Sequence, residues 1–244
     1  MNYVAIAIAP GIAICLYFFY KDIYNKEPRL NLIVSFILGC LTILPAILFE
    51  NAFSESAIDG SVGGVAVFSY LVVALSEEGS KFAALRYYSY NQKSFDEPLD
   101  GIVYSVLVGM GFATVENIMY VLKFAETGMG MQVGISRMFL SVPAHATFAV
   151  VMGYFAGKAK FDSPKSFSLL LMGLLGAVFF HGTYDFFLFI NQYSYVGKEM
   201  GEGLVGGGAI ISFIVSLVLC RKLIRRHTDL SKKMFDEKNK TISV

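Results

Sequence analysis

The sequence has few charged residues and no long polar segment. Charged side chains make up 16% of the 244 residues, whereas a soluble domain carries about 25%. No polar stretch is long enough to fold as a separate soluble domain. The net charge is only +1, so the composition gives no reason to expect a nucleic-acid partner. These scarcities argue against a soluble protein and indicate a membrane protein.

Cysteine is also scarce, and none of the three cysteines forms a CxxC pair. Cys15, Cys40 and Cys220 lie far apart, in or at the ends of apolar runs, so we interpret them as small buried or lipid-facing residues. The N-terminus lacks the basic segment of a cleaved signal peptide, so residues 1–20 are expected to form a first membrane span. Low-complexity segments and a clear internal repeat are absent too.

What the sequence does contain is seven apolar blocks of about 20 residues, the length that crosses roughly 30 Å of hydrocarbon. We expect an all-α, polytopic bundle of seven transmembrane helices, embedded in the lipid bilayer. Residues 1–224 would form the membrane domain, and residues 225–244 a polar, solvated and partly disordered tail. The predicted spans are residues 3–20, 31–49, 62–86, 100–124, 133–157, 166–190 and 203–223.

The distribution of lysine and arginine predicts the orientation of the chain. Basic residues concentrate in alternate loops and in the tail, whereas the loop at residues 50–61 has none. By the positive-inside rule, the N-terminus is outside and the C-terminal tail is cytoplasmic. Arg137 and Lys123 belong to a loop predicted to be outside and count against this assignment. Several acids are interpreted as ordinary loop or span-end charges: Glu27, Asp96, Glu97 and Asp100.

The third predicted span contains two adjacent acids, Glu77 and Glu78, and one base, Lys81. Near the centre of a bilayer each charge costs roughly 2.5 to 3.5 kcal/mol, so a chain that keeps them is expected to use them. On a helix Glu77 is four residues and Glu78 three residues from Lys81, within reach of its ammonium. We expect Lys81 to pair with Glu77, which would leave Glu78 freer to react.

Three further spans carry ionisable or amide side chains at a similar predicted depth. Glu116 and Asn117 lie in the fourth span, His145 in the fifth, and His181 and Asp185 in the sixth. Intramembrane charges rarely face lipid. One shared internal site therefore explains the four spans better than four unrelated features.

A metal site is one chemistry that this set fits. Glu116, His145 and His181 match a two-histidine, one-carboxylate set for Zn²⁺ with an open position for water. Asp185, one turn after His181, would accept a hydrogen bond from that ring and fix its tautomer. One of the two adjacent glutamates, Glu77 or Glu78, would be the general base.

A metal-free site fits as well. In that version Glu77 or Glu78 activates water directly, a histidine polarises the carbonyl, and Asn117 donates to the oxyanion. Both versions describe peptide hydrolysis inside a membrane. A transporter for protons or divalent metal could use the same groups, although the missing inverted repeat counts against it. A non-catalytic scaffold that binds a partner helix would leave the clustered charges unexplained.

Short motifs in the same order between about residues 9 and 187 resemble one known family. They read Ala9-Pro-Gly11, Asn25-Lys-Glu-Pro28, Glu77-Glu78-Gly-Ser-Lys81, Asp100-Gly-Ile-Val-Tyr104, Gly111-Phe-Ala-Thr-Val-Glu116-Asn117, Pro143-Ala-His145 and His181-Gly-Thr-Tyr-Asp185. This ordered set resembles the PrsW family of bacterial intramembrane proteases, which is related to the CAAX-processing and bacteriocin-protecting membrane proteases.

The resemblance implies a multi-pass protease of the bacterial cytoplasmic membrane. Its substrate would be a single-pass, membrane-anchored anti-sigma factor, and its cut would be the first in regulated intramembrane proteolysis, releasing a stress-response sigma factor. The functional positions carried over are Glu77, Glu78, Glu116, His145 and His181. The wider superfamily has been described both as metal-dependent and as glutamate-type, so both mechanisms stay open. Zinc is the one cofactor expected, and the oligomeric state is not predicted.

Overall fold

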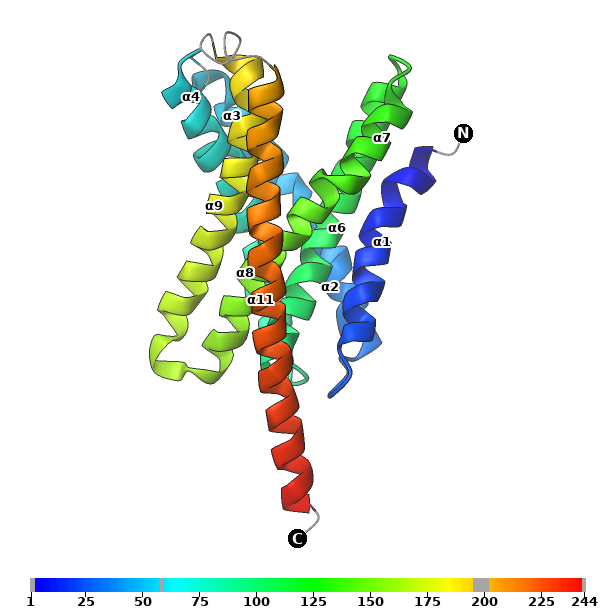
Figure 1. Cartoon of the computed structure of the whole chain (residues 1–244), viewed down its shortest axis with the longest axis vertical. Coiled ribbons are helices and arrows are strands. Elements are labelled where there is room, and N and C mark those ends of the chain that lie inside the picture. The colour runs from blue at the N-terminus through cyan, green and yellow to red at the C-terminus, as the bar shows by residue number, and fades with distance from the viewer. Residues whose placement is uncertain (1–2, 58, 195–201, 243–244) are drawn as a thin grey trace.

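The described part of the chain is a bundle of long helices (Figure 1). The computed structural model describes residues 3–57, 59–194 and 202–242, and these contain no strand. Seven stretches are long and apolar enough to cross a membrane: Tyr3–Lys21, Arg29–Phe53, Val62–Asn91, Pro98–Ala125, Gly130–Phe161, Ser166–Ile190 and Gly206–Lys240. The prediction of an all-α bundle with seven spans is therefore confirmed. The two termini lie at opposite ends (Figure 1), but the side that each faces stays a prediction.

Four of the spans are single helices and three are broken. The single helices are α1 (Tyr3–Lys21), α6 (Pro98–Ala125), α9 (Ser166–Tyr193) and α11 (Glu202–Ile242). The second span consists of α2 (Arg29–Leu41) and α3 (Ile43–Ala57), and the fifth of α7 (Gly130–Phe139) and α8 (Ser141–Phe161). The third consists of α4 (Val62–Val67), the π-helix η1 (Phe68–Ala74), α5 (Leu75–Tyr87) and the 3₁₀-helix η2 (Ser89–Asn91). A second 3₁₀-helix, η3 (Ser163–Lys165), precedes α9.

Helix α6 is the central helix of the bundle. Every side chain from Pro98 to Thr114 is buried, because α1, α2, α5 and α8 pack around it. Its closest neighbour is α8, where a Cβ atom added to Gly101 would lie 2.4 Å from the carbonyl oxygen of Gly153. Small residues allow such close backbone approach between membrane helices. Glu116 lies on α6 and His145 on α8, so the packing of these two helices brings two predicted site residues together.

The third span changes its helical geometry just before the two adjacent glutamates. The seven residues Phe68–Ala74 form a π-helix, a rare form that occurs mostly at functional sites. The α-helical geometry resumes at Leu75, and both glutamates and Lys81 then face the interior as buried side chains. The π-helix is therefore followed directly by the polar face of α5, which points into the bundle.

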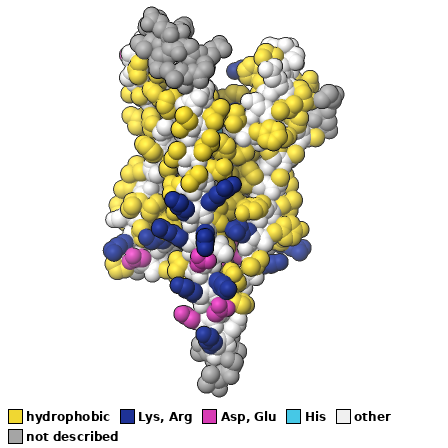
Figure 2. Space-filling model, in the orientation of Figure 1, with side chains coloured by type: hydrophobic (Ala, Val, Ile, Leu, Met, Phe, Trp, Pro, Cys, Tyr) yellow, Lys and Arg dark blue, Asp and Glu magenta, His cyan; other side chains and the backbone are white. Residues whose placement is uncertain are grey.

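The C-terminal helix differs from the sequence prediction. Residues 225–242 were expected to be partly disordered, but α11 continues without a break to Ile242, so that expectation is wrong for the described part of the tail. His227 and Ser231 are fully buried, and the hydroxyl of Ser231 accepts a hydrogen bond from the backbone N–H of Leu99 at 3.2 Å. The last turns extend beyond the other helices (Figure 1), and Lys and Arg side chains gather around this end (Figure 2).

Candidate active site

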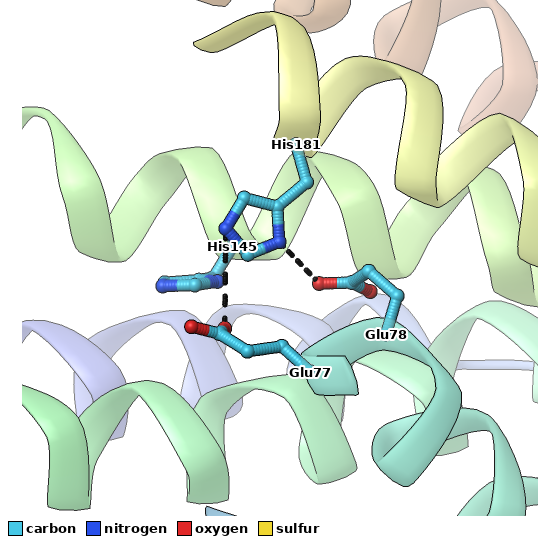
Figure 3. A group of neighbouring side chains, drawn as sticks. All are labelled: Glu77, Glu78, His145 and His181. Carbon is cyan, nitrogen blue, oxygen red and sulfur yellow. Dashed lines mark hydrogen bonds and ion pairs between the residues drawn. The ribbon is translucent and has the colours of Figure 1, made fainter. Parts of the chain in front are cut away.

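Three helices bring acidic and imidazole side chains together in the interior of the bundle. Glu77 and Glu78 come from α5, His145 from α8 and His181 from α9 (Figure 3). One donor atom of each residue lies within 4.8 Å of the others, and all four residues are buried. The shared site that the sequence suggested is therefore present as a geometric cluster.

Lys81 occupies the middle of this cluster. Its ammonium nitrogen lies 3.0 Å from Oε2 of Glu77 and 2.8 Å from Oε1 of Glu78. It also lies 3.3 Å from Nδ1 of His145 and 3.8 Å from the centre of the Phe112 ring. The expectation that Lys81 pairs with Glu77 and leaves Glu78 free is wrong in its second half, because both carboxylates accept from the same ammonium.

Each of the two histidines contacts an outer carboxylate through Nε2. Nε2 of His181 lies 3.1 Å from Oδ2 of Asp185, while its Nδ1 lies 2.9 Å from Oε1 of Glu78. Nε2 of His145 lies 3.0 Å from Oε2 of Glu116, while its Nδ1 faces the ammonium just described. In each ring Nε2 contacts an outer carboxylate, whereas Nδ1 contacts Glu78 in His181 and the Lys81 ammonium in His145. Nε2 of His181 also lies 3.9 Å from Oε2 of Glu77. This arrangement is typical of imidazoles that are oriented to present their second nitrogen to a ligand.

Glu116 and Asn117 are held by Arg137 of α7, and Glu116 lies beside the four-residue cluster through its contact with His145. Arg137 donates through Nη2 to the carboxylate of Glu116 and through Nε to Oδ1 of Asn117 at 3.0 Å. The amide nitrogen of Asn117 donates to the backbone carbonyl of Ala7 on α1 at 2.9 Å. The predicted roles of Glu116 as a metal ligand and Asn117 as an oxyanion donor stay predictions. The observed contacts give both residues a positioning role.

Two residues of this region were missed as site residues. Arg137 was counted only as a loop charge, and its conflict with the positive-inside pattern was the signal that it is used inside the bundle. Its guanidinium lies 4.1 Å from the centre of the Tyr120 ring. Glu50 of α3 was also counted as a loop charge, but it accepts a hydrogen bond from the hydroxyl of Ser76 at 3.3 Å.

A cavity of about 810 Å³ connects the cluster with one end of the bundle. Its walls include Glu77 but not Glu78, and they continue to Lys123 near the end of α6 and Gln192 near the end of α9. Both ends lie at the upper end of the molecule in Figure 1, where Figure 2 shows a notch between two arms. Other polar residues of the site also line the cavity: Glu50, Glu116, Arg137, His145, His181 and Asp185. The site is thus reached from the end predicted to be outside.

A family model described as "PrsW family intramembrane metalloprotease" matches residues 27–220. The chain belongs to the PrsW family. It is 38% identical to "Protease PrsW" of Geobacillus kaustophilus over 78% of this chain and 80% of that protein. It is 34% identical to the protein of that name from Clostridioides difficile over 94% and 93% of the two chains, and 37% identical to that of Bacillus subtilis over 76% and 82%. No solved structure matches.

Membership of the PrsW family answers several questions raised by the sequence. The chain is an intramembrane protease and a multi-pass protein of the bacterial cell membrane. The predicted resemblance and the protease class are therefore confirmed. The family description also contains the word metalloprotease, so the donor set of this PrsW chain has to be tested for its fit to a metal ion.

The charges of the site fit a divalent cation. The site contains four carboxylates and two permanent cations: Lys81 pairs with Glu77 and Glu78, Arg137 pairs with Glu116, and Asp185 contacts only His181 among these pairs. Four negative charges against two positive charges leave two negative charges, which one divalent ion would neutralise. Imidazole nitrogen and carboxylate oxygen are also the donor types that zinc takes in catalytic sites.

Proposed function

We propose that this PrsW-family chain hydrolyses a peptide bond in a single-pass, membrane-anchored anti-sigma factor, with a zinc ion held by Glu78, His145 and His181. One observation carries the proposal. Two buried imidazoles each contact an outer carboxylate through Nε2, and both lie in one cluster with Glu77 and Glu78 beside a cavity. When bound, zinc would act as a Lewis acid towards water and the scissile carbonyl.

The geometry favours Glu77 over Glu78 as the general base. Of the two, only Glu77 lines the cavity from which water and substrate would arrive. Glu78 is 1% exposed, and its Oε1 atom contacts both Lys81 and His181. Glu77 would take a proton from a water molecule while the oxygen of that water bonds to the scissile carbonyl carbon. It would then deliver that proton to the amine nitrogen as the carbon–nitrogen bond breaks.

The remaining polar residues hold these groups in place. Asp185 and Glu116 accept from Nε2 of the two histidines, so that Nδ1 of each neutral ring could bind a ligand in place of its contact with Glu78 or Lys81. Lys81 holds the buried carboxylate of Glu77 through the ion pair at 3.0 Å. Arg137 holds Glu116 through a second ion pair. Together these contacts pre-organise the site before substrate enters.

The substrate class rests on the cavity and on the resemblance. The cavity reaches the end of the bundle that the positive-inside pattern assigns to the outside. A cut on that side would be the first in the anti-sigma factor, as the family resemblance implies. The hydrophobic surface of the bundle in Figure 2 suits a substrate that is itself anchored in the bilayer.

Reconstitution with a defined substrate tests the proposal. The purified chain and a single-pass anti-sigma factor from the same bacterium would be placed in liposomes, and the fragments identified by mass spectrometry. We expect one cut near the outer membrane surface, loss of the cut in Glu77→Gln, and loss on chelation with recovery on adding zinc. Glu126→Gln makes the same chemical change at an exposed position and should cleave normally. Cleavage that survives both Glu77→Gln and Glu78→Gln would exclude the proposed chemistry, whereas zinc or proton flux without cleavage would favour a transporter.

A further inference from the structure

A second cluster of buried acids lies at the other end of the bundle, where α1 ends and α6 begins. One oxygen from each of Asp22, Glu97 and Asp100 lies within 4.8 Å of the other two, and all three residues are buried. Glu27 is a fourth buried acid of this group: its backbone N–H donates to Asp22 at 2.9 Å, and it is 3% exposed. We name these four residues the acidic cluster.

Each acid uses one oxygen for a hydrogen bond within the protein. Oδ2 of Asp100 accepts from the backbone N–H groups of Asp96 and Glu97 at 2.9 and 2.8 Å. Oε2 of Glu27 accepts from the hydroxyl of Tyr104. The side chain of Glu97 in turn accepts from the backbone N–H of Asp100 in the cap of α6. These bonds hold the four carboxyl groups in place.

The second oxygen of each acid has no partner among the described residues. Four such atoms are buried in the cluster: Oδ1 of Asp22, Oε1 of Glu27, Oε1 of Glu97 and Oδ1 of Asp100. Leaving a buried charged oxygen without a partner is unfavourable by several kcal/mol. Buried carboxylates with free oxygens are thus expected to coordinate a metal, to pair with a base, or to share protons.

Neighbouring positive charge does not account for the cluster. Among the residues that the structure describes, no lysine, arginine or histidine makes an ion pair with any of the four acids. The N-terminus of α6 supplies roughly half a positive charge, which is small beside up to four negative charges. Burial raises the pKa of Glu27 and of Glu97 to about 7, as expected where carboxylates crowd without a cation.

We propose that the acidic cluster is a binding site for a hard divalent cation such as Mg²⁺, Ca²⁺ or Mn²⁺, separate from the intramembrane site. Its donors are all oxygens, and carboxylate oxygen is the ligand type that these ions prefer, whereas zinc favours nitrogen and sulfur. The inference does not depend on the proposed function of the intramembrane site.

A cation there would link parts of the chain that are far apart in sequence. Asp22 and Glu27 belong to the connection between α1 and α2, Glu97 to the connection before α6, and Asp100 to the first turn of α6. The bond from Leu99 to Ser231 attaches α11 at the same place. Bound cation would therefore clamp the first two helices to the centre of the bundle and stabilise the fold.

Terbium luminescence provides a direct test in the unmodified protein. Tb³⁺ takes the place of Ca²⁺ in oxygen sites and emits when a nearby tyrosine transfers energy to it. The chain has no tryptophan, and Tyr104 contacts Glu27 of the cluster. We expect saturable emission that Mg²⁺, Ca²⁺ or Mn²⁺ displaces and that falls several-fold in Tyr104→Phe. The His145→Ala, His181→Ala double variant should keep the emission, which would exclude the intramembrane site as its source.

Matched variants complete the test by measuring Mn²⁺ bound per chain and thermal stability. Asp22→Asn and Glu97→Gln remove charge from the cluster, whereas Asp96→Asn makes the same change at an exposed neighbour. The proposal expects Mn²⁺ binding and a Mn²⁺-dependent rise in Tm in wild type and Asp96→Asn, and neither in the cluster variants. The proposal would be overturned if the wild-type protein bound neither Tb³⁺ nor Mn²⁺ saturably. It would also be overturned if the cluster variants became more stable while cations left the Tm of the wild type unchanged, which would indicate protonated carboxyl groups instead.

Discussion

Oε2 of Glu116 lies 3.0 Å from Nε2 of His145, the ring nitrogen that does not face Lys81. Asp185 stands in the same relation to His181. Each histidine of the site therefore contacts a supporting carboxylate through Nε2, on another helix for His145 and on the same helix for His181. This duplication separates residues that would hold a metal ion from residues that orient its ligands.

The first prediction concerns Glu116→Gln. An orienting carboxylate typically contributes a factor of roughly 10 to 100 in metal affinity, so we expect a loss of that size in zinc affinity, and a similar loss in Asp185→Asn. Zinc titration followed by elemental mass spectrometry measures it, with Glu126→Gln as the control. An unchanged affinity would exclude the orienting role. Complete loss of zinc would instead make Glu116 a ligand, as the sequence first suggested.

The second prediction concerns Lys81→Met. The change keeps the apolar stem but leaves two buried carboxylates without their ammonium, and breaking a buried pair in this way costs about 3–5 kcal/mol. We expect the metal-free protein to lose stability by that order and zinc to recover much of it. Thermal unfolding can be followed with a thiol-reactive dye, because Cys15 and Cys220 are buried. Equal stability of variant and wild type in chelator would contradict the assigned contacts.

The third prediction concerns Arg137→Lys, which preserves the charge but not the planar fork of the side chain. Arg137 bonds Glu116 and Asn117 through different nitrogens, and one ammonium cannot reproduce that geometry. We expect normal expression and helix content, but a roughly 10-fold loss of zinc affinity, because Glu116 would no longer be held against His145. Full zinc affinity in the lysine variant would show that charge alone suffices.

The fourth prediction compares two glycines. A Cβ atom at Gly153 would lie 2.3 Å from the backbone carbonyl of Gly101, whereas one at Gly79 meets nothing within 4 Å. Gly153→Ala should therefore lower stability by roughly 1–3 kcal/mol through overpacking. Gly79→Ala should raise stability by about 0.5–1 kcal/mol, because alanine is the better helix former. Unfolding temperatures in one detergent compare the two, and equal shifts would contradict the close contact of α6 and α8.

Sequence alone predicts the features that depend on the spacing of residues close together along the chain. Seven apolar blocks give the spans, and positions i, i+3 and i+4 give the contacts of Lys81 with Glu77 and Glu78. The same rule gives the contact of Asp185 with His181. Each of these depends only on helix periodicity, which the sequence displays directly.

The features that sequence could not supply depend on side-chain direction or on distant contacts. The predicted depth in the membrane placed Glu116 beside the histidines. Only the three-dimensional structure shows that its carboxylate contacts Nε2 of His145 and is held by Arg137. Asp22 meets Glu97 and Asp100 across more than seventy residues, and nothing local marks that contact. The burial of His227 and Ser231 in α11 escaped notice for the same reason, because the charged composition around them resembles that of a solvated tail.

The length of α11 has a consequence for how the protein sits in a bilayer. Forty-one residues at 1.5 Å each extend about 61 Å, twice the roughly 30 Å of the hydrocarbon layer. Its apolar half must match that layer, and the basic residues from Arg221 onward must stay at the phosphate headgroups. Because α11 is hydrogen-bonded to the start of α6, this single helix sets the depth of the whole bundle in the bilayer. A lipid bilayer of altered thickness would then tilt the bundle rather than let it slide, so Glu77 would keep its depth relative to the headgroups.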